Sequence, residues 1–422
     1  MDSGTAEFLA LQKQIQGQTG QTLARIQRAK AVYSTGCLGL DAAIGRIDPI
    51  FKNGGIPERS IVEIFGVNGA YKSGTLEHLI RSVQQRGKTA VIVYSEEPDF
   101  DRMERIGVNI GMPKEVKRGK HKRTIGGLMV INAYQRTANQ EERLLLAERA
   151  LRDAIRASKH EWVGLVGVDS LKGLTSAGQI YDKGNMSAAK ERGFDQSETA
   201  PRARMMEKFF DRLKVHCKCA IIVIVNQLNE SITKDYTIGI DDRPKTSGGR
   251  RKEFEALIRI KIDSRDIEEK QEHEIFPFKP QIGLQVVYWL CKNKYSQFTG
   301  RRKVEADFMF TTQKFNRAKE ILRYAAYLGM IERKGNFYTF PDGHKANGEP
   351  RAIKYLKNSS CREMRKELEV EIIQRSNELF SNKKGSSKQK AKSVLAKEFE
   401  ETSADVVSLR SKKKSNKSKK AA

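Results

Sequence analysis

A glycine-containing turn followed by Lys and Ser is the feature of this sequence best suited to binding a phosphate. Residues 61–66 (IVEIFG) predict a buried strand, and residues 66–73 read GVNGAYKS. In a phosphate-binding loop, backbone N–H groups and the start of the next helix surround phosphate oxygens. A lysine adds positive charge, and a Ser or Thr hydroxyl binds Mg²⁺. Lys72 and Ser73 have the residue types and positions for these roles, so the stretch predicts a phosphate site that uses Mg²⁺.

Tyr71 departs from the usual pattern, because such loops normally carry glycine immediately before the lysine. A residue with a Cβ atom is disfavoured at positive φ. We therefore expect the loop to be distorted or shifted in register, with Gly69 and Gly74 making the turn.

Three other apolar segments end in polar residues that would complete such a site. Asp169 follows one of them and would reach the water shell of a bound metal ion. Glu96 and Glu97 follow another, and one of them would orient an attacking water; a helix N-cap or a surface charge is the alternative for either. Gln227 ends the third, where its amide would sense a γ-phosphate. Each pattern is common alone, so the prediction depends on their combination.

Apolar segments alternate with amphipathic ones along most of the chain. The predicted strands lie at residues 61–66, 89–97, 162–170 and 220–227, and the predicted helices at 73–86, 140–158 and 203–216. Wholly apolar strands separated by helices indicate a largely parallel sheet covered on both faces, so the predicted fold class is α/β. Ligands bind at the carboxyl ends of such strands. The polar segments 176–200 and 228–250 begin there and are interpreted as functional loops, with tolerated surface insertions as the alternative.

The charge of the chain points to a polyanionic partner. The formal net charge is +26, and the predicted disordered tail, residues 381–422, is rich in lysine. Nucleic acid or an anionic membrane would attract such a chain, whereas the tail alone could also be merely solubilising. No apolar run approaches the length needed to span a bilayer, and the N-terminus lacks an export pattern, so we expect an intracellular protein. The five cysteines are scattered and odd in number, which argues against a disulfide framework.

The order of these motifs resembles one family, the bacterial RecA recombinases. The shared motifs, in chain order, are STGCLGLDAAIG, GGIPERSIVEIFG with its loop, the strand ending in Glu97, VDSL, ARMMEKFFDRL, IVNQL, TSGG and CKNK. The stretch FNRAKEILRYAAYLGMIERKGNFYTF is similar to that family's C-terminal domain, so the resemblance covers about residues 5–380. It implies a RecA-type P-loop ATPase core with a mostly parallel sheet. The implied domains are an N-terminal oligomerisation helix (1–33), the core with DNA-binding loops (34–312), a small α/β domain (313–380) and the basic tail (381–422).

The resemblance also assigns roles to individual residues. ATP and Mg²⁺ are the implied cofactors. Glu97, Lys72 and Gln227 would be catalytic, and Ser73 and Asp169 would hold the metal. The nucleotide would be bound by Gly66, Asn68, Gly69, Ala70, Tyr71, Lys72, Ser73 and Gly74, with Lys292 and Lys294 reaching the nucleotide of a neighbouring subunit. DNA would be bound by the two loops and by Arg204, Gly248, Gly249 and Arg250.

The function implied is that of a DNA-dependent ATPase recombinase. It would form filaments of its own copies on single-stranded DNA, pair them with double-stranded DNA and act in the bacterial cytoplasm. A filament protein that coats DNA with weakened or lost ATPase activity is the alternative, and Tyr71 favours it. A hexameric helicase or an accessory repair ATPase is a third possibility, which CKNK and the C-terminal stretch disfavour.

Three features depart from the family. They are Tyr71, the basic insertion KEVKRGKHKRTIGG at residues 114–127, and a basic tail where bacterial RecA tails are acidic. Together they suggest a divergent, phage-encoded member with less self-restraint on DNA.

Overall fold

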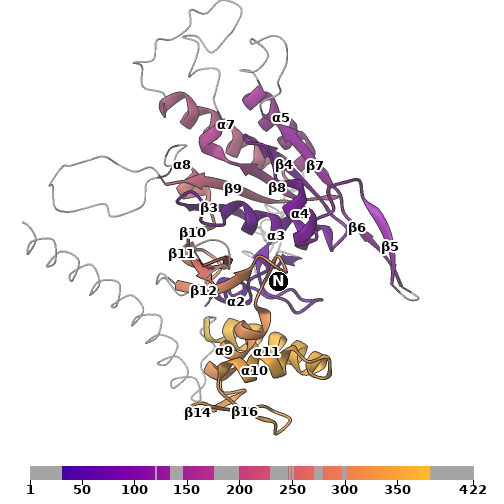
Figure 1. Ribbon diagram of the computed structural model, residues 1–422. Helices are drawn as coiled ribbons and strands as arrows, with labels where there is room; N and C mark the ends of the chain where they lie inside the picture. Colours follow the sequence, from indigo (N-terminus) through magenta and orange to yellow (C-terminus); the bar gives the residue numbers. More distant parts are fainter. Residues whose placement is uncertain are drawn as a thin grey trace, which may run out of the picture.

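The computed structural model describes residues 31–118, 121–133, 146–174, 199–228, 246, 249, 251–269, 279–296 and 302–380 (Figure 1). The predictions for the N-terminal helix, most of the two polar loops and the basic tail lie outside these residues. Gly248 and Arg250 lie outside them as well.

A nine-stranded sheet organises the described part of the chain. Its order is β13-β12-β11-β10-β3-β9-β8-β4-β7. The strands are β3 (Ile61–Gly66), β4 (Thr89–Tyr94), β7 (Leu128–Asn132), β8 (Val163–Asp169), β9 (Ile221–Gln227), β10 (Ile258–Glu268), β11 (Gln281–Asn293), β12 (Arg302–Met309) and β13 (Lys314–Phe315). Pairing is parallel from β10 through β3 to β7 and antiparallel from β10 to β13. The predicted α/β class with a mostly parallel central sheet is confirmed.

Helices cover both faces of the parallel half, as Figure 1 shows. Helix α3 (Lys72–Gln84) lies on one face, and α5 (Leu146–Ser158) and α7 (Thr199–His216) lie on the other. Strand β9 shows why both faces must be covered. Its residues Ile221, Val223 and Val225 belong to the core cluster of α3, whereas Ile222 and Ile224 belong to that of α5 and α7. Successive side chains of a strand point to opposite faces, so a wholly apolar strand supplies two cores.

The predicted strands and helices exist, but several ends differ. The strand expected to reach residue 97 ends at Tyr94, so both glutamates lie beyond it. Helix α7 begins at Thr199, within the segment predicted as a polar loop. Shorter elements complete this part: β1 (Val32–Tyr33), α2 (Leu38–Ile44), β2 (Ile56–Pro57), α4 (Phe100–Ile106), η2 (Leu171–Gly173) and α8 (Arg251–Glu255).

The C-terminal residues form a small α/β unit beside the core. It contains α9 (Arg317–Tyr327), β14 (Glu332–Lys334), β15 (Phe337–Thr339), β16 (Lys345–Asn347), α10 (Glu349–Lys357), η3 (Ser359–Cys361) and α11 (Arg362–Phe380). Its three strands form an antiparallel sheet in the order β14-β15-β16. Leu38 and Ala42 of α2 join the apolar cluster of this unit, so the unit shares a core with the main body. The exact domain limits remain a prediction.

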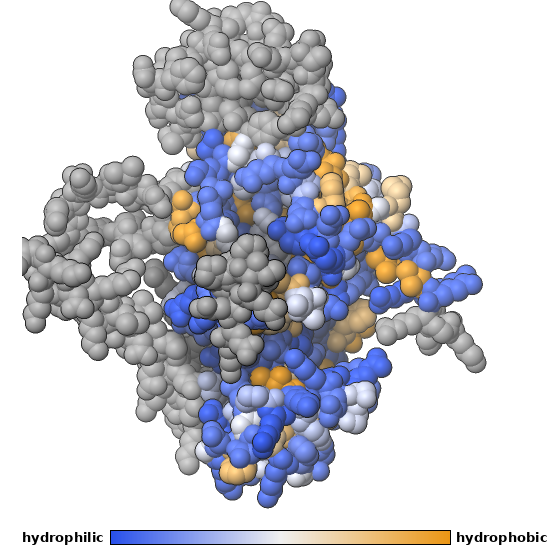
Figure 2. Space-filling model, in the orientation of Figure 1, coloured by the Kyte–Doolittle hydropathy of each residue, from blue (hydrophilic) through white to orange (hydrophobic). Residues whose placement is uncertain are grey.

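The basic insertion forms a two-stranded antiparallel ribbon of β5 (Lys114–Arg118) and β6 (His121–Ile125). It projects from the body near β7 (Figure 1). Figure 2 shows a mainly hydrophilic face, with apolar patches towards the side that carries β7 and the ribbon. Within the described ranges, no helix has the length and hydropathy required to cross a membrane.

Candidate nucleotide-binding site

The sheet register brings the predicted polar residues to one edge. Gly66, the last residue of β3, lies opposite Gln227, the last residue of β9. Asp169, the last residue of β8, lies opposite Tyr94, the last residue of β4. Since β3, β9, β8 and β4 are consecutive in the sheet, their carboxyl ends form a single rim. The phosphate loop and the polar residues beyond the strands therefore meet, as the sequence predicts.

The loop between β3 and α3 keeps the register of a phosphate loop, despite Tyr71. The Tyr71 backbone has φ 66° and ψ 27°, and α3 begins at the next residue. The backbone N–H of Thr75 donates to the Tyr71 carbonyl at 3.1 Å, which closes the first helical turn. Gly69 also has positive φ, 75°, but Gly74 lies inside α3 without it. The expected shift of the turn to Gly74 was wrong, because Tyr71 itself adopts the left-handed conformation.

The packing of the Tyr71 ring offsets the cost of a left-handed backbone at a residue other than glycine. Its centroid lies 4.3 Å from that of Phe308, and its hydroxyl lies 3.0 Å from His78 Nε2. A Cβ atom at Gly74 would lie only 2.4 Å from the ring, so this glycine leaves room for it. Burial raises the pKa of Tyr71 above its ordinary value and lowers the pKa of His78 to about 3, so both groups are neutral. The ring fills the core beneath the loop instead of the space where a phosphate would bind.

Replacing Tyr71 by Gly is therefore expected to destabilise the protein. Removing a buried aromatic ring costs about 3–5 kcal/mol, whereas relieving a left-handed non-glycine residue regains about 1–2 kcal/mol. We expect Tyr71→Gly to lower the free energy of unfolding by about 2 kcal/mol, measured by urea denaturation. Tyr71→Phe is the matched control, since it removes only the hydroxyl contact with His78 and should lose about 1 kcal/mol. A glycine variant as stable as wild type would contradict this packing role.

Lys72, Ser73 and Asp169 form a compact group at the mouth of the loop. The Lys72 Nζ donates to the Val67 carbonyl at 2.5 Å, and the Ser73 hydroxyl hydrogen-bonds to the Asp169 carboxylate. The pKa of Asp169 is raised to about 6, chiefly by burial and in part by Glu96, while Ser73 and Lys72 oppose the rise. Burial lowers the pKa of Lys72, against the attraction of Asp169 and Glu96. A hydroxyl and a carboxylate in contact beside a lysine are a donor set that fits Mg²⁺ and phosphate oxygens.

The two glutamates beyond β4 are not equivalent. Glu96 raises the pKa of both Lys72 and Asp169, and its influence on each is larger than that of Glu97. Both side chains are exposed. The N-cap of α4 is Asp99, so neither glutamate serves as that cap. The catalytic role that the resemblance gives to Glu97 remains a prediction. The electrostatic effect on Lys72 and Asp169 favours Glu96 for that role.

A buried ion pair behind this group was not predicted. Glu77 of α3 accepts from Arg102 of α4 through Nε at 3.0 Å and Nη2 at 2.5 Å. Burial raises the pKa of Glu77, and Arg102 opposes the rise. The pair fixes α4, and hence the segment that carries Glu96, against the helix that begins at the loop. No signal in the sequence identifies it, because the two residues lie on different helices.

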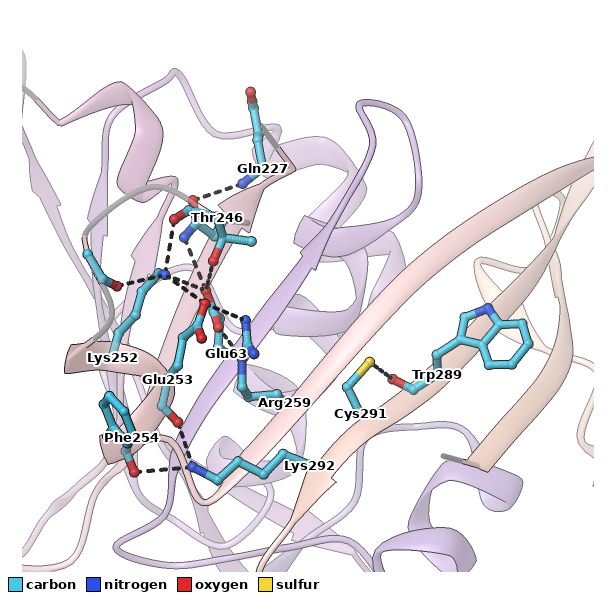
Figure 3. A network of polar contacts seen from close by, with 12 residues as sticks. Glu63, Gln227, Thr246, Lys252, Glu253, Phe254, Arg259, Trp289, Cys291 and Lys292 are labelled. Atoms are coloured by element: carbon cyan, nitrogen blue, oxygen red, sulfur yellow. Dashed lines mark hydrogen bonds and ion pairs between the residues drawn. The ribbon is translucent and has the colours of Figure 1, made fainter. Parts of the chain in front are cut away.

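A second unpredicted feature is a buried polar network around Glu63 in β3 (Figure 3). Glu63 accepts from Arg259 Nε at 2.7 Å and from the Thr246 hydroxyl at 2.8 Å, and Lys252 Nζ lies 3.5 Å away. Asn226 of β9 donates to the same carboxylate at 3.2 Å. Burial alone would raise the pKa of Glu63, but the two cations and the hydrogen bonds hold it below its ordinary value.

This network fixes the ends of the segment predicted as the second loop. Leu228 and Thr246 form an isolated antiparallel bridge, which brings the two ends together. Lys252 Nζ also donates to the carbonyls of Thr246 and Gly249, at 3.2 and 3.1 Å. The segment that follows Gln227 is thus tied to the strand that leads into the phosphate loop.

The remaining predicted residues lie around this network. Lys292 donates to the carbonyls of Glu253 and Phe254 at 2.5 and 3.2 Å, as Figure 3 shows. Lys292 lies opposite Arg259 of β10, whereas Gly66 lies opposite Ile262 of the same strand. The two positions are three residues apart, which is about 10 Å along the strand. Lys292 therefore lies away from the loop of its own chain.

Lys294 and Arg204 are exposed. Gly249 has φ 78°, and a Cβ atom there would lie 2.9 Å from that of Ala203. Gly249 and Arg204 are therefore brought close together, at the start of α7.

The fold and site define an α/β protein with a candidate phosphate-binding loop at the carboxyl edge of a mostly parallel sheet. No family model matches the chain. Among curated proteins, the Protein RecA of Nitratiruptor sp. is 26% identical over 342 residues, covering 80% of this chain and 83% of the relative. That of Caldanaerobacter subterraneus is 28% identical over 345 residues (81% and 83%), and that of Caulobacter vibrioides is 26% identical over 329 residues (77% and 76%). Over most of its length the chain is therefore similar to RecA proteins, at modest sequence identity.

Proposed function

We propose that the protein is a DNA-dependent ATPase recombinase, which assembles on single-stranded DNA and promotes homologous pairing and strand exchange. The observation that carries this proposal is the group of Lys72, Ser73 and Asp169 at the mouth of the loop, tied through Glu63 to the segment after Gln227. The similarity to RecA proteins supports it. The proposed place of action is the bacterial cytosol, and a phage-encoded origin stays a prediction.

The residues of the loop would bind the nucleotide. The backbone N–H groups of residues 66–74 and the Lys72 amine would surround the β- and γ-phosphates. Ser73 and Asp169 would hold Mg²⁺, which, when bound, neutralises charge on the phosphate oxygens. A glutamate beyond β4 would orient the attacking water, and Gln227 would respond to the γ-phosphate at the rim it shares with Gly66.

The coupling to DNA would use the ends of the loop after Gln227. Arg204 and Gly249 lie together at this side, where exposed cations and backbone would make sequence-independent, salt-sensitive contacts with phosphates. Lys292 and Lys294 would complete the nucleotide site of a neighbouring subunit. The register supports this role in trans, because Lys292 lies away from its own loop.

The alternative, a DNA-coating filament protein with a decayed ATPase, depended on Tyr71. Its ring is packed into the core and its backbone keeps the left-handed conformation. The geometry therefore removes the reason for expecting an obstructed loop, and we do not favour the alternative.

ATP hydrolysis with Mg²⁺, measured with and without single-stranded DNA, tests the proposal. We expect hydrolysis that DNA stimulates, strand exchange between homologous substrates, and filaments visible by electron microscopy on single-stranded DNA with ATP. Lys72→Ala should lower the hydrolysis rate by about 10²-fold or more, because it removes a charge at the γ-phosphate. Folded wild-type protein that neither hydrolyses ATP nor exchanges strands would refute the proposal.

A further inference from the structure

The ribbon of β5 and β6 carries an unbalanced positive charge. Lys114, Lys117, Lys122 and Arg123 are all exposed, and Glu115 is the single acidic residue between positions 114 and 125. In the part of the chain that the structure describes, no acidic side chain forms an ion pair with these four cations. Their charge is therefore available to an external anion.

The register of the ribbon places like charges together. Lys117 is directly opposite Lys122. Like charges in directly opposite positions destabilise an antiparallel pair, by roughly 0.2–1 kcal/mol. A polyanion lying along the ribbon would attract both lysines and so offset this repulsion.

The ribbon has an anchored base. The Gln84 side chain, at the end of α3, donates to the Asn109 carbonyl at 2.7 Å and accepts from its N–H at 2.8 Å. The Asn109 side chain donates to the Gly126 carbonyl at 2.9 Å, and the Gly126 N–H donates to the Gln84 carbonyl at 2.9 Å. A Cβ atom at Gly126 would lie 1.8 Å from the Lys88 carbonyl oxygen, so the chain must pass close to the body here. The base holds the ribbon in a defined direction from the sheet.

The positive surface continues from the ribbon onto the body. Arg123 lines a cavity of about 620 Å³ between the core and the C-terminal unit. Lys52, Arg81 and Lys314 line the same cavity, and no ion pair with an acid in the described residues involves them. Asp41 and Glu369 also line this cavity, but no ion pair in the described residues joins either of them to Arg81, Lys52 or Lys314. Burial lowers the pKa of Arg81, and Arg317 lowers it further.

We propose that this ribbon is a second DNA-binding element. It would hold duplex DNA through its phosphates, while the two predicted DNA-binding loops hold single-stranded DNA. The inference rests on the proposed function for the identity of the polyanion. A two-stranded ribbon fits the major groove of B-form DNA, and strands of five residues extend about 17 Å, enough to cross several phosphates. The alternation of side chains lets Lys114 and Lys117 point to opposite faces and reach both groove walls.

The double variant Lys117→Gln/Lys122→Gln tests the ribbon. Binding of a labelled duplex oligonucleotide is measured by fluorescence anisotropy over a series of salt concentrations. Two lost phosphate contacts should reduce the slope of log K against log salt by about 2 and weaken duplex binding about tenfold or more at 0.1 M salt. DNA-stimulated ATP hydrolysis with single-stranded DNA should stay within about twofold of wild type.

Two further variants control for charge and folding. Lys117→Arg/Lys122→Arg should retain wild-type duplex binding, and Arg152→Gln/Lys159→Gln removes two exposed cations on and beside α5 and should change the slope far less. An unchanged duplex slope in Lys117→Gln/Lys122→Gln, with hydrolysis intact, would overturn the ribbon proposal alone. Loss of wild-type hydrolysis and of all DNA binding would instead refute the proposed function. Ribbon-dependent binding of anionic vesicles without duplex binding would overturn DNA as the ligand.

Discussion

Replacing Glu96 with Gln is expected to lower DNA-stimulated ATP hydrolysis by about 10²- to 10⁴-fold, the range typical of a lost general base or water-positioning carboxylate. Glu96 acts on both Lys72 and Asp169, the two charged groups of the candidate phosphate and metal site. Its carboxylate therefore lies within electrostatic reach of the place where the γ-phosphate and its attacking water would be. The measurement is kcat at saturating ATP and Mg²⁺ with single-stranded DNA.

Glu97→Gln is the matched control, because it changes the same residue type one position away on the same exposed segment. We expect it to retain hydrolysis within about tenfold, far less than the loss expected for a catalytic carboxylate. ATP binding, measured separately by calorimetry, should survive in both variants. The reverse result, with hydrolysis lost only in Glu97→Gln, would give the role to Glu97 as the resemblance implies.

Replacing Glu63 with Gln is expected to lower the free energy of unfolding by about 3–5 kcal/mol, the penalty for leaving a buried charge unpaired. Glu63 is 1% exposed, and its two cationic partners, Lys252 and Arg259, are 1% and 7% exposed. The variant keeps the size of the side chain but leaves these cations with Glu253 as their remaining acidic partner in the described part of the chain. Urea denaturation gives the free energy.

Glu305→Gln provides the control for this loss. Glu305 pairs with Lys303 at 2.6 Å, but its side chain is 22% exposed, so water can replace the partner. An ion pair of this kind contributes about 0–1 kcal/mol. Equal destabilisation by the two substitutions would show that the Glu63 network has no special energetic role.

The strands and the turn between β3 and α3 were predictable because their signals are local. A wholly apolar strand such as β9 shows its two-sided burial in its own residues, and Lys72 and Ser73 follow a recognisable turn. The rim formed by the strand ends follows from the parallel sheet, a general property of such folds.

The conformation of Tyr71 and the role of Glu63 were not predictable, because their causes lie far away in the sequence. The Tyr71 ring needs Phe308 of β12 as a packing partner, and only the folded sheet brings them together. Glu63 interrupts an apolar strand, and its partners Thr246 and Arg259 come from later segments.

Two further features could not be predicted, for a different reason: which of Glu96 and Glu97 faces the site, and the shape of the basic insertion. The direction of a side chain just past a strand depends on how the backbone turns there, which the pattern of residues does not specify. The insertion at 114–127 was interpreted by charge alone, although its alternation around a glycine is typical of a hairpin.

The bridge between Leu228 and Thr246 has a consequence for how this protein can evolve. Since the bridge and the Glu63 network fix both ends of the intervening segment, insertions or deletions between them need not displace the sheet. Doubling the length of a closed loop costs only about 0.6 kcal/mol in chain entropy. On the proposed function, the DNA contacts of this segment can therefore diversify between lineages while the candidate nucleotide site and the stability of the core are inherited unchanged.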